Sequence, residues 1–168
     1  MGNTTGITSR QRADEVAARI GGRLDAQRVE LFEITVDGAR LTRRWTALSH
    51  PAAEFDAGDG ADEHEVPLGW FPWSLGNIRP SKYMFIRNAG ALAVAHDSST
   101  TIGDLGLTSA LHLPVLGLAP GICAAATLSS APVIGAVCAY WSDERASWSS
   151  DDRELLCSWA LDASSALR

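Results

Sequence analysis

The chain has 168 residues and a formal net charge of −6 at pH 7. A chain of this length forms one ordinary domain with a substantial core, and a hydrophobic fraction of 46% is typical of soluble globular proteins. The acidic balance excludes the dense basic face that nucleic-acid phosphates require. We therefore expect one domain over residues 1–168 that does not bind nucleic acid directly.

The cysteines and the longest uncharged stretch bear on the cellular compartment that we expect for this protein. Cys123, Cys138 and Cys157 are an odd number at wide spacings, which argues against a disulfide framework and a zinc site. No basic region followed by an apolar run marks a secretory signal. Residues 105–142 lack Asp, Glu, Lys and Arg, but prolines and glycines interrupt them, so we expect no membrane span. These features predict a cytoplasmic protein.

The N-terminal part predicts a helix followed by a hairpin. Apolar residues at helical spacing predict a helix over residues 8–25. Residues 28–36 have the pattern of a strand, and Asp37-Gly38 is the two-residue sequence with positive φ that a tight hairpin uses. Residues 40–48 form the returning strand. The apolar residues expected on one face of this strand are Leu41, Trp45 and Ala47.

The middle of the chain is irregular and leaves alternatives open. Residues 54–65 form an acidic segment whose spacing does not match a calcium loop, and we expect a solvated loop of open role. The segment "PLGWFPWSLG" that follows places Trp70, Phe71 and Trp73 within four residues, between proline and glycine. These rings could fill the core, line a pocket or meet a partner. A short helix between turns suits residues 67–78.

The second half predicts three strands and a final helix. The expected strands are residues 83–87, 108–116 and 132–141, with one or two helical turns over 98–105. Residues 118–131 are apolar and rich in small side chains, and could extend a hairpin or pack as a loop.

The final helix is expected over residues 149–168, with Ser149 as its N-cap. Its apolar face carries Leu155, Leu156, Trp159, Ala160, Ala163 and Leu167. A second stripe consists of Cys157, Leu161 and Ser164. This order of elements predicts an α+β fold, in which an antiparallel sheet has the terminal helices packed together on one face.

Two parts of the sequence resemble a known family. "GLTSALHLPV" (106–115), followed by "VIGAVCAYW" (133–141) and "RASWSSDDRELLCSWALDASSAL" (145–167), resembles the C-terminal half of a GAF domain. "FPWSLGNIRP" (71–80) is similar to the Phe-Pro-Trp segment of some bacterial sensor GAF domains. The resemblance covers about three quarters of the chain, although the link over 117–132 is longer than the family's usual hairpin.

The resemblance implies a GAF-like fold of the PAS/GAF type, with an antiparallel sheet of about six strands. It also implies a small-molecule pocket on the sheet face away from the terminal helices. The candidate ligand-binding residues are Trp70, Phe71, Trp73, Tyr83, Ser109 and His112. His112 alternates with two leucines and so lies on the strand face opposite them; it could contact a ligand or be a hydrogen-bonded core histidine.

The implied function is a non-enzymatic sensory or regulatory domain that binds a small molecule. Such a domain signals through its terminal helices in a homodimer, or to a kinase or transcription-regulator partner. The alternative is a ligand-free GAF module for dimerisation or protein interaction. Fold alone does not decide between them.

The residues disfavour several chemistries known in the family. The single lysine, Lys82, is not part of the Asn-Lys-Phe-Asp-Glu signature of cyclic-nucleotide binders. Cys123 has no adjacent histidine, as covalent tetrapyrrole attachment usually needs. No histidine is paired as in a haem or iron site. Cys138 and Cys157 lack the neighbouring basic residue that free methionine sulfoxide reduction would require. We expect no catalytic set and no metal site, and the ligand stays open.

Overall fold

The computed structural model describes residues 9–49, 65–66, 83–88, 106–117, 130–147 and 153–167. The elements in these residues are α1 (Ser9–Leu24), β1 (Arg28–Ile34), β2 (Ala39–Thr46), β3 (Glu65–Val66), β4 (Met84–Ile86), β5 (Ser109–Leu116), β6 (Val133–Trp141) and α5 (Arg153–Ala166). The predicted segments 67–78, 98–105 and most of 118–131, as well as the N-cap Ser149, lie outside the described residues.

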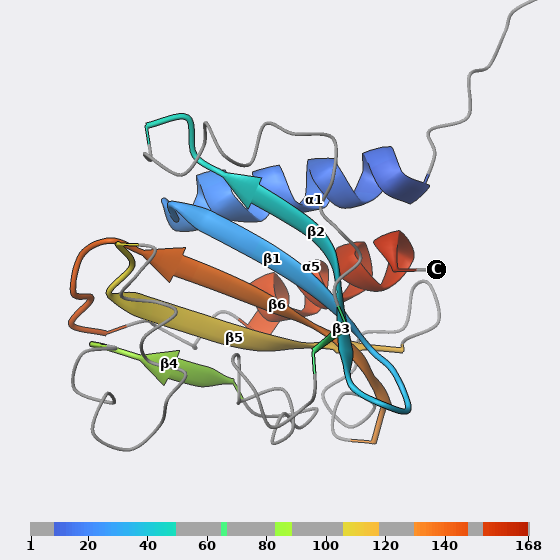
Figure 1. Ribbon diagram of the computed structural model, residues 1–168. Coiled ribbons are helices and arrows are strands. Elements are labelled where there is room, and N and C mark those ends of the chain that lie inside the picture. Colours follow the sequence, from blue (N-terminus) through green and yellow to red (C-terminus); the bar gives the residue numbers. More distant parts are fainter. Residues whose placement is uncertain are drawn as a thin grey trace, which may run out of the picture.

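The described strands form one six-stranded sheet in the order β3-β2-β1-β6-β5-β4, and all neighbouring strands are antiparallel. Helices α1 and α5 pack side by side on one face of this sheet (Figure 1). The predicted α+β architecture, with the terminal helices together on one face, is therefore confirmed. That residues 1–168 form a single domain stays a prediction.

An apolar stripe attaches α1 to the sheet. Ala13, Val16, Ala17 and Ile20 recur at helical spacing, and all four are buried against the strands. The helix is followed by Asp25, whose φ of 50° ends the helical path. Trp159, Ala163 and Ala166 of α5 join the same core, and an ion pair between Arg19 and Asp162 links the two helices.

The hairpin between β1 and β2 differs from the sequence-based prediction. The N–H of Thr35 donates to the carbonyl of Gly38 over 2.9 Å, so the central turn residues are Val36 and Asp37. Neither Asp37 nor Gly38 has a positive φ. The Gly38 N–H donates to the side-chain oxygen of Thr35 over 3.0 Å. This local bond from a threonine side chain stabilises a turn that needs no left-handed residue.

A β-bulge also changes which side chains share a face of β2. Phe32 pairs with Leu41 whereas Leu31 pairs with Arg43, so Thr42 is the extra residue. Trp45 packs on the helix side, and Leu41 packs on the other side of the sheet. The prediction that Leu41 and Trp45 share a face was therefore wrong, because one extra residue reverses the alternation.

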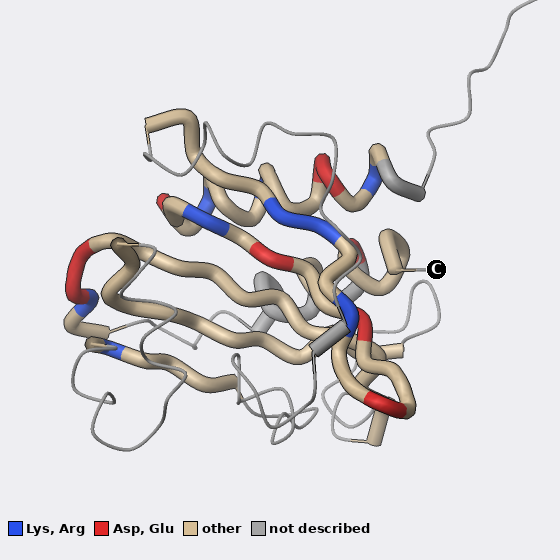
Figure 2. The backbone as a smooth tube through the Cα atoms, viewed as in Figure 1, with Lys and Arg blue, Asp and Glu red and all other residues tan. Residues whose placement is uncertain are grey.

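The long uncharged stretch of the sequence contains two inner strands. β5 and β6 carry no charged residue, whereas the neighbouring β1 and β2 do (Figure 2). β6 is buried from Gly135 to Trp141, as expected for a strand covered on both faces. Within the described part of the chain, no helix is long and apolar enough to cross a membrane.

Candidate functional site

The two faces of the sheet have different partners. On one face, Val29, Leu111 and Val137 join the core with α1 and α5. On the opposite face, Phe32, Ala136 and Tyr140 belong to a separate apolar cluster. We call this second face, directed away from α1 and α5, the distal face.

A buried carboxylate lies at the centre of the charged part of the distal face. Glu30 Oε1 accepts hydrogen bonds from Arg28 Nε over 3.1 Å and from Arg44 Nε over 3.0 Å. Glu30 Oε2 accepts one from the Tyr140 hydroxyl over 3.1 Å. We call Arg28, Glu30, Arg44 and Tyr140 the Glu30 cluster. A buried carboxylate is tolerated only when it is paired and hydrogen-bonded in this way.

Strand register brings the cluster together. Arg28 and Glu30 are two residues apart on β1, so both side chains project to one face. Glu30 pairs with Arg44 on β2 and with Cys138 on β6, while Arg28 pairs with Tyr140. The cluster thus joins three neighbouring strands at the middle of the sheet.

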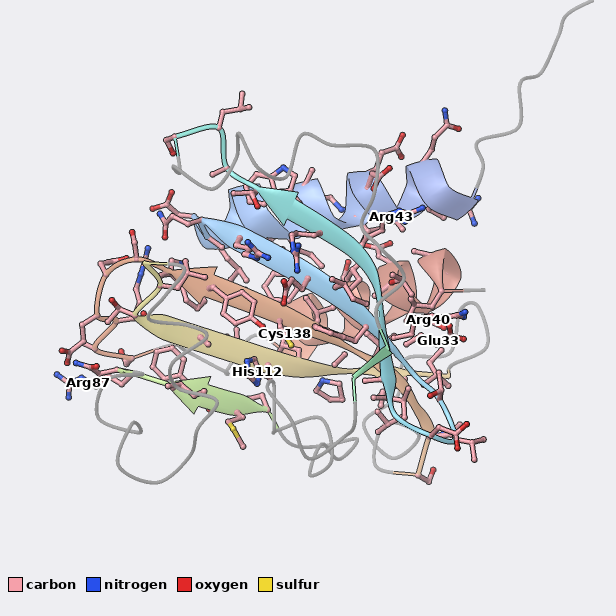
Figure 3. All side chains as sticks on the ribbon, viewed as in Figure 1. Glu33, Arg40, Arg43, Arg87, His112 and Cys138 are labelled. Carbon is pink, nitrogen blue, oxygen red and sulfur yellow. The ribbon has the colours of Figure 1, made fainter. Side chains whose placement is uncertain are left out.

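His112 and Cys138 extend this polar region onto β5. They pair directly across β5 and β6 and lie side by side in Figure 3. The His112 ring makes an edge-to-face contact with Tyr140, with ring centroids 5.9 Å apart and planes at 71°. His112 therefore lies on the distal face beside the Glu30 cluster.

Burial keeps this extension uncharged. Desolvation lowers the pKa of His112 to about 3, so its imidazole is neutral at pH 7. Desolvation, together with the nearby Glu30 charge, raises the pKa of Cys138. Desolvation, together with the neighbouring Cys138 and Glu30, also raises the pKa of Tyr140. A thiol with a raised pKa stays protonated and is a poor nucleophile.

The polar groups are surrounded by apolar side chains. The buried members of this distal apolar cluster are Phe32, Ala39, Leu41, Ile86, Leu107, Ala110, Ala136, Cys138 and Tyr140. Ile34 and Met84 pack against them. A few fixed polar groups within an apolar surface are typical of small-molecule sites.

The described residues separate two of the predicted site residues. His112 lies on the distal face, but Ser109 is three residues earlier on β5 and pairs with Trp141, which belongs to the core under α1 and α5. The Ser109 hydroxyl donates to the carbonyl of Asp143. Tyr83 precedes β4 and is 39% exposed. Trp70, Phe71 and Trp73 lie outside the described residues. Ligand binding by all six stays a prediction.

Sequence reasoning missed the Glu30 cluster. A signal was present in β1, where Arg28 and Glu30 alternate with the apolar Val29 and Leu31. Alternation identifies a polar face, but usually a solvated one. The pairing of β1 with β2 and β6 is what brings Arg44 and Tyr140 to the Glu30 carboxylate. Among the described residues, no three His, Cys, Asp or Glu side chains come close enough to hold a metal ion.

No family model and no curated protein matches this chain. Solved structures do resemble it, over nearly its whole length. The red light-absorbing state of NpR6012g4, a red/green cyanobacteriochrome, matches with a TM-score of 0.66 and 12% identity over 95% of this chain and 93% of that one. The photoproduct state of GAF3 from Slr1393 of Synechocystis sp. PCC6803 matches with a TM-score of 0.65 and 12% identity, over 95% of this chain and 93% of that one.

A domain of a protein assigned as a two-component sensor histidine kinase, from Sinorhizobium meliloti 1021, matches with a TM-score of 0.57. Its identity is 15%, over 97% of this chain and 90% of that one. Together with the strand order and the paired terminal helices, these matches show that the chain has the fold of a GAF domain. At such identities the likeness establishes the fold alone.

Proposed function

We propose that this GAF-fold chain is a non-enzymatic sensory or regulatory domain that binds a small molecule on the distal face of its sheet. The proposal depends on one observation: the carboxylate of Glu30 is buried in the face directed away from α1 and α5, where it is hydrogen-bonded by Arg28, Arg44 and Tyr140. A face that served only as core would be cheaper to build from apolar side chains. Charged groups held by mutual hydrogen bonds offer a ligand a fixed set of polar contacts.

The solved structures with the same fold support a sensory role. Their titles describe cyanobacteriochrome photoreceptors and a domain of a sensor histidine kinase protein. On this analogy, the chain would pass its signal to a kinase or transcription-regulator partner. The analogy concerns the class of function and carries over no ligand.

The contacts of β6 provide a physical route from the distal face to α1. Tyr140 belongs to the Glu30 cluster, and its carbonyl accepts the N–H of Gln27, just before β1. The next residue, Trp141, donates from its indole nitrogen to the carbonyl of Leu24 over 3.1 Å. A ligand that favours one position of Tyr140 would therefore shift the population of positions of the C-terminal end of α1.

The proposed output surface is formed by the terminal helices. A groove of about 520 Å³ between α1 and α5 is lined by Arg12, Glu15, Val16, Arg19, Asp162 and Ser165. Both signs of charge occur there, so a second copy of the chain could form complementary ion pairs. The same groove favours the second candidate function, a ligand-free module for dimerisation or protein interaction.

Native mass spectrometry separates the two candidates. The protein would be measured as purified, and again after incubation with a protein-free small-molecule extract of the expressing cells. The proposal predicts excess mass above the 17.9 kDa chain, removed by denaturation. The bare chain mass in both samples, observed as a dimer, would support the ligand-free module instead.

A further inference from the structure

We propose that residues 142–145 are a tether through which the edge strand β4 controls the capping of the C-terminal end of α1. This inference rests on the proposed function for its regulatory role, because it gives the distal face a second route to the terminal helices. The coupling itself is a property of the chain without a ligand. It is carried by two consecutive side chains of opposite charge, Glu144 and Arg145, which bind different elements of the fold.

The C-terminal end of α1 is capped by side chains from the end of β6 and from the tether. The last carbonyl groups of a helix have no partner within the helix. Here the carbonyl of Leu24 accepts the indole N–H of Trp141 over 3.1 Å, and the carbonyl of Asp25 accepts Arg145 Nη2 over 3.3 Å. The Arg145 guanidinium also lies over the Trp141 ring, 5.2 Å from its centroid. Arg145 therefore holds both the helix end and the indole that caps it.

The preceding residue, Glu144, binds the end of β4. Its Oε1 lies 2.9 Å from Nε of Arg87, and its Oε2 accepts a hydrogen bond from Nδ2 of Asn88 over 3.0 Å. Arg87 and Asn88 directly follow β4. Both carboxylate oxygens are thus bound by one two-residue segment, so a displacement of β4 would move Glu144. Since Glu144 and Arg145 share a peptide bond, the same displacement would move the cap of α1.

The backbone of the tether is held from two sides. The Thr108 hydroxyl donates to the carbonyl of Ser142 over 2.9 Å, and the Ser109 hydroxyl donates to the carbonyl of Asp143. From the other side, the N–H of Ser142 donates to Oε1 of Gln27 over 3.0 Å. These bonds join the tether to the start of β5 and to the residue before β1. A short segment fixed at several points transmits a displacement rather than absorbing it.

β4 is the strand of this pathway that contacts the distal apolar cluster. Met84 and Ile86 of β4 pack in that cluster, and the strand pairs with β5 alone among the described strands. An edge strand of three residues has fewer restraining hydrogen bonds than an inner strand. A ligand that covers Met84 or Ile86 would therefore favour one position of β4, and the tether would pass that preference to α1.

The test measures the cap of α1 after a change at the far end of the tether. The probe is hydrogen exchange of the Trp141 indole N–H, followed by NMR in the full chain without ligand. Arg87→Gln should increase this exchange rate about two- to fivefold, as expected when an exposed ion pair that restrains the cap is lost. The Arg87 side chain is 64% exposed, so the substitution leaves the core intact. Arg87→Lys should give a smaller increase, because lysine keeps the charge.

A double-mutant cycle shows whether the effect passes through Arg145. Arg145→Gln removes the bond to Asp25 and should raise the exchange rate at least as much as Arg87→Gln does. In the Arg145→Gln background, Arg87→Gln should add less than about a 1.5-fold increase, because the connection to the cap is already lost. Arg40→Gln is the matched control. Arg40 forms an ion pair with Glu33 at the opposite end of the sheet from Arg87 (Figure 3), so the exchange rate should not change.

Three results would overturn the inference: an unchanged exchange rate in Arg87→Gln, an equal increase in Arg40→Gln, or effects of Arg87→Gln and Arg145→Gln that simply multiply. Circular dichroism checks that each variant is folded. If Arg145→Gln does not fold, the comparison of the two Arg87 variants with Arg40→Gln decides.

Failure of the inference is distinguishable from failure of the proposed function, because the exchange rates are measured without ligand. An adduct in the native mass spectrum, together with a cap that Arg87→Gln leaves unchanged, would sustain a small-molecule sensor and reject the tether. The bare chain mass in both samples, together with the expected increase in exchange, would reject the sensor and sustain the coupling.

Discussion

The hydroxyl of Tyr140 donates a hydrogen bond to Glu30 Oε2 over 3.1 Å, although the two residues are 110 positions apart in the chain. Both side chains are buried, and their strands β6 and β1 are neighbours at the centre of the sheet. This bond connects the charged region on β1 and β2 with the uncharged strands β5 and β6.

Removal of that hydroxyl should destabilise the fold. In Tyr140→Phe, Glu30 Oε2 loses its donor while remaining buried, so the free energy of unfolding should fall by about 1–3 kcal/mol. Urea denaturation measures the change. Tyr83→Phe is the control, because Tyr83 is the only other tyrosine and is 39% exposed; it should change stability by less than about 0.5 kcal/mol. Equal effects of the two substitutions would contradict a structural role for the Tyr140–Glu30 bond.

His112 should make the fold sensitive to acid. Its pKa is lowered to about 3 in the folded chain from 6.5, so below pH 6.5 the unfolded chain takes up a proton that the folded chain does not. Titration of His112 therefore leaves the free energy of unfolding unchanged above pH 6.5. As the pH falls from 6.5 toward 3, this free energy decreases by up to about 1.4 kcal/mol per pH unit.

The variant His112→Gln isolates this contribution. Cys138 and Tyr140 face His112 from β6, and both have raised pKa values, so neither titrates in this window. Glu30 is common to both proteins. Unfolding free energies measured from pH 7.5 to 3.5 should therefore fall less steeply in the variant, and the two slopes should coincide above pH 6.5. Parallel curves over the whole range would show that His112 titrates normally.

Two adjacent glycines of α1 should respond in opposite directions to alanine. A Cβ on Gly21 would lie 2.1 Å from Cζ3 of Trp45, whereas a Cβ on Gly22 would meet nothing within 4 Å. Gly21→Ala should therefore destabilise by about 1–3 kcal/mol through overpacking. Gly22→Ala should stabilise by about 0.5–1 kcal/mol, because alanine favours the helix. Thermal unfolding checks both; a loss at Gly22 as large as that at Gly21 would contradict the close contact of α1 with β2.

The helix surface should control self-association. If α1 and α5 pair with those of a second copy, light scattering should show a mass that rises from one chain to two with concentration. Arg12→Glu, on the groove between the helices, should shift this equilibrium toward the monomer, because it removes a cation that could pair with an acidic side chain of the second copy. A monomer at all concentrations, with and without the small-molecule extract, would remove the support for signalling through a dimer.

The sequence predicted most of the fold because its elements are regular. The periodicity of α1 and the apolar runs of β5 and β6 predict the type of each element, and the predicted ends lie within one or two residues of the observed ones. The β1–β2 hairpin was predicted less well. The position of its turn depends on a bond from the Thr35 side chain, and the face of Leu41 depends on the bulge at Thr42. Neither the hydrogen bond nor the bulge produces a periodic pattern of apolar residues, so the sequence does not reveal them.

The candidate site was harder to predict than the fold. His112 was found because it interrupts an apolar strand. Arg28, Glu30 and Arg44 were missed, because charged residues that alternate with apolar ones usually indicate a solvated face. They form one hydrogen-bonded cluster only when β1 pairs with β2 and with β6, which supplies Tyr140 from 110 residues away. Such long-range contacts are not encoded in any local segment.

Methyl-resolved NMR spectra of the chain, recorded before and after addition of a protein-free small-molecule extract of the expressing cells, test the central claim most directly. If a ligand binds on the distal face, the largest shift changes should fall on the methyl groups of Leu41, Ile86 or Leu107. The methyl groups of Leu31, Leu111 and Val137, which pack under α1 and α5, should change less. Changes confined to the helix side, or no change at all, would contradict a ligand site on the distal face.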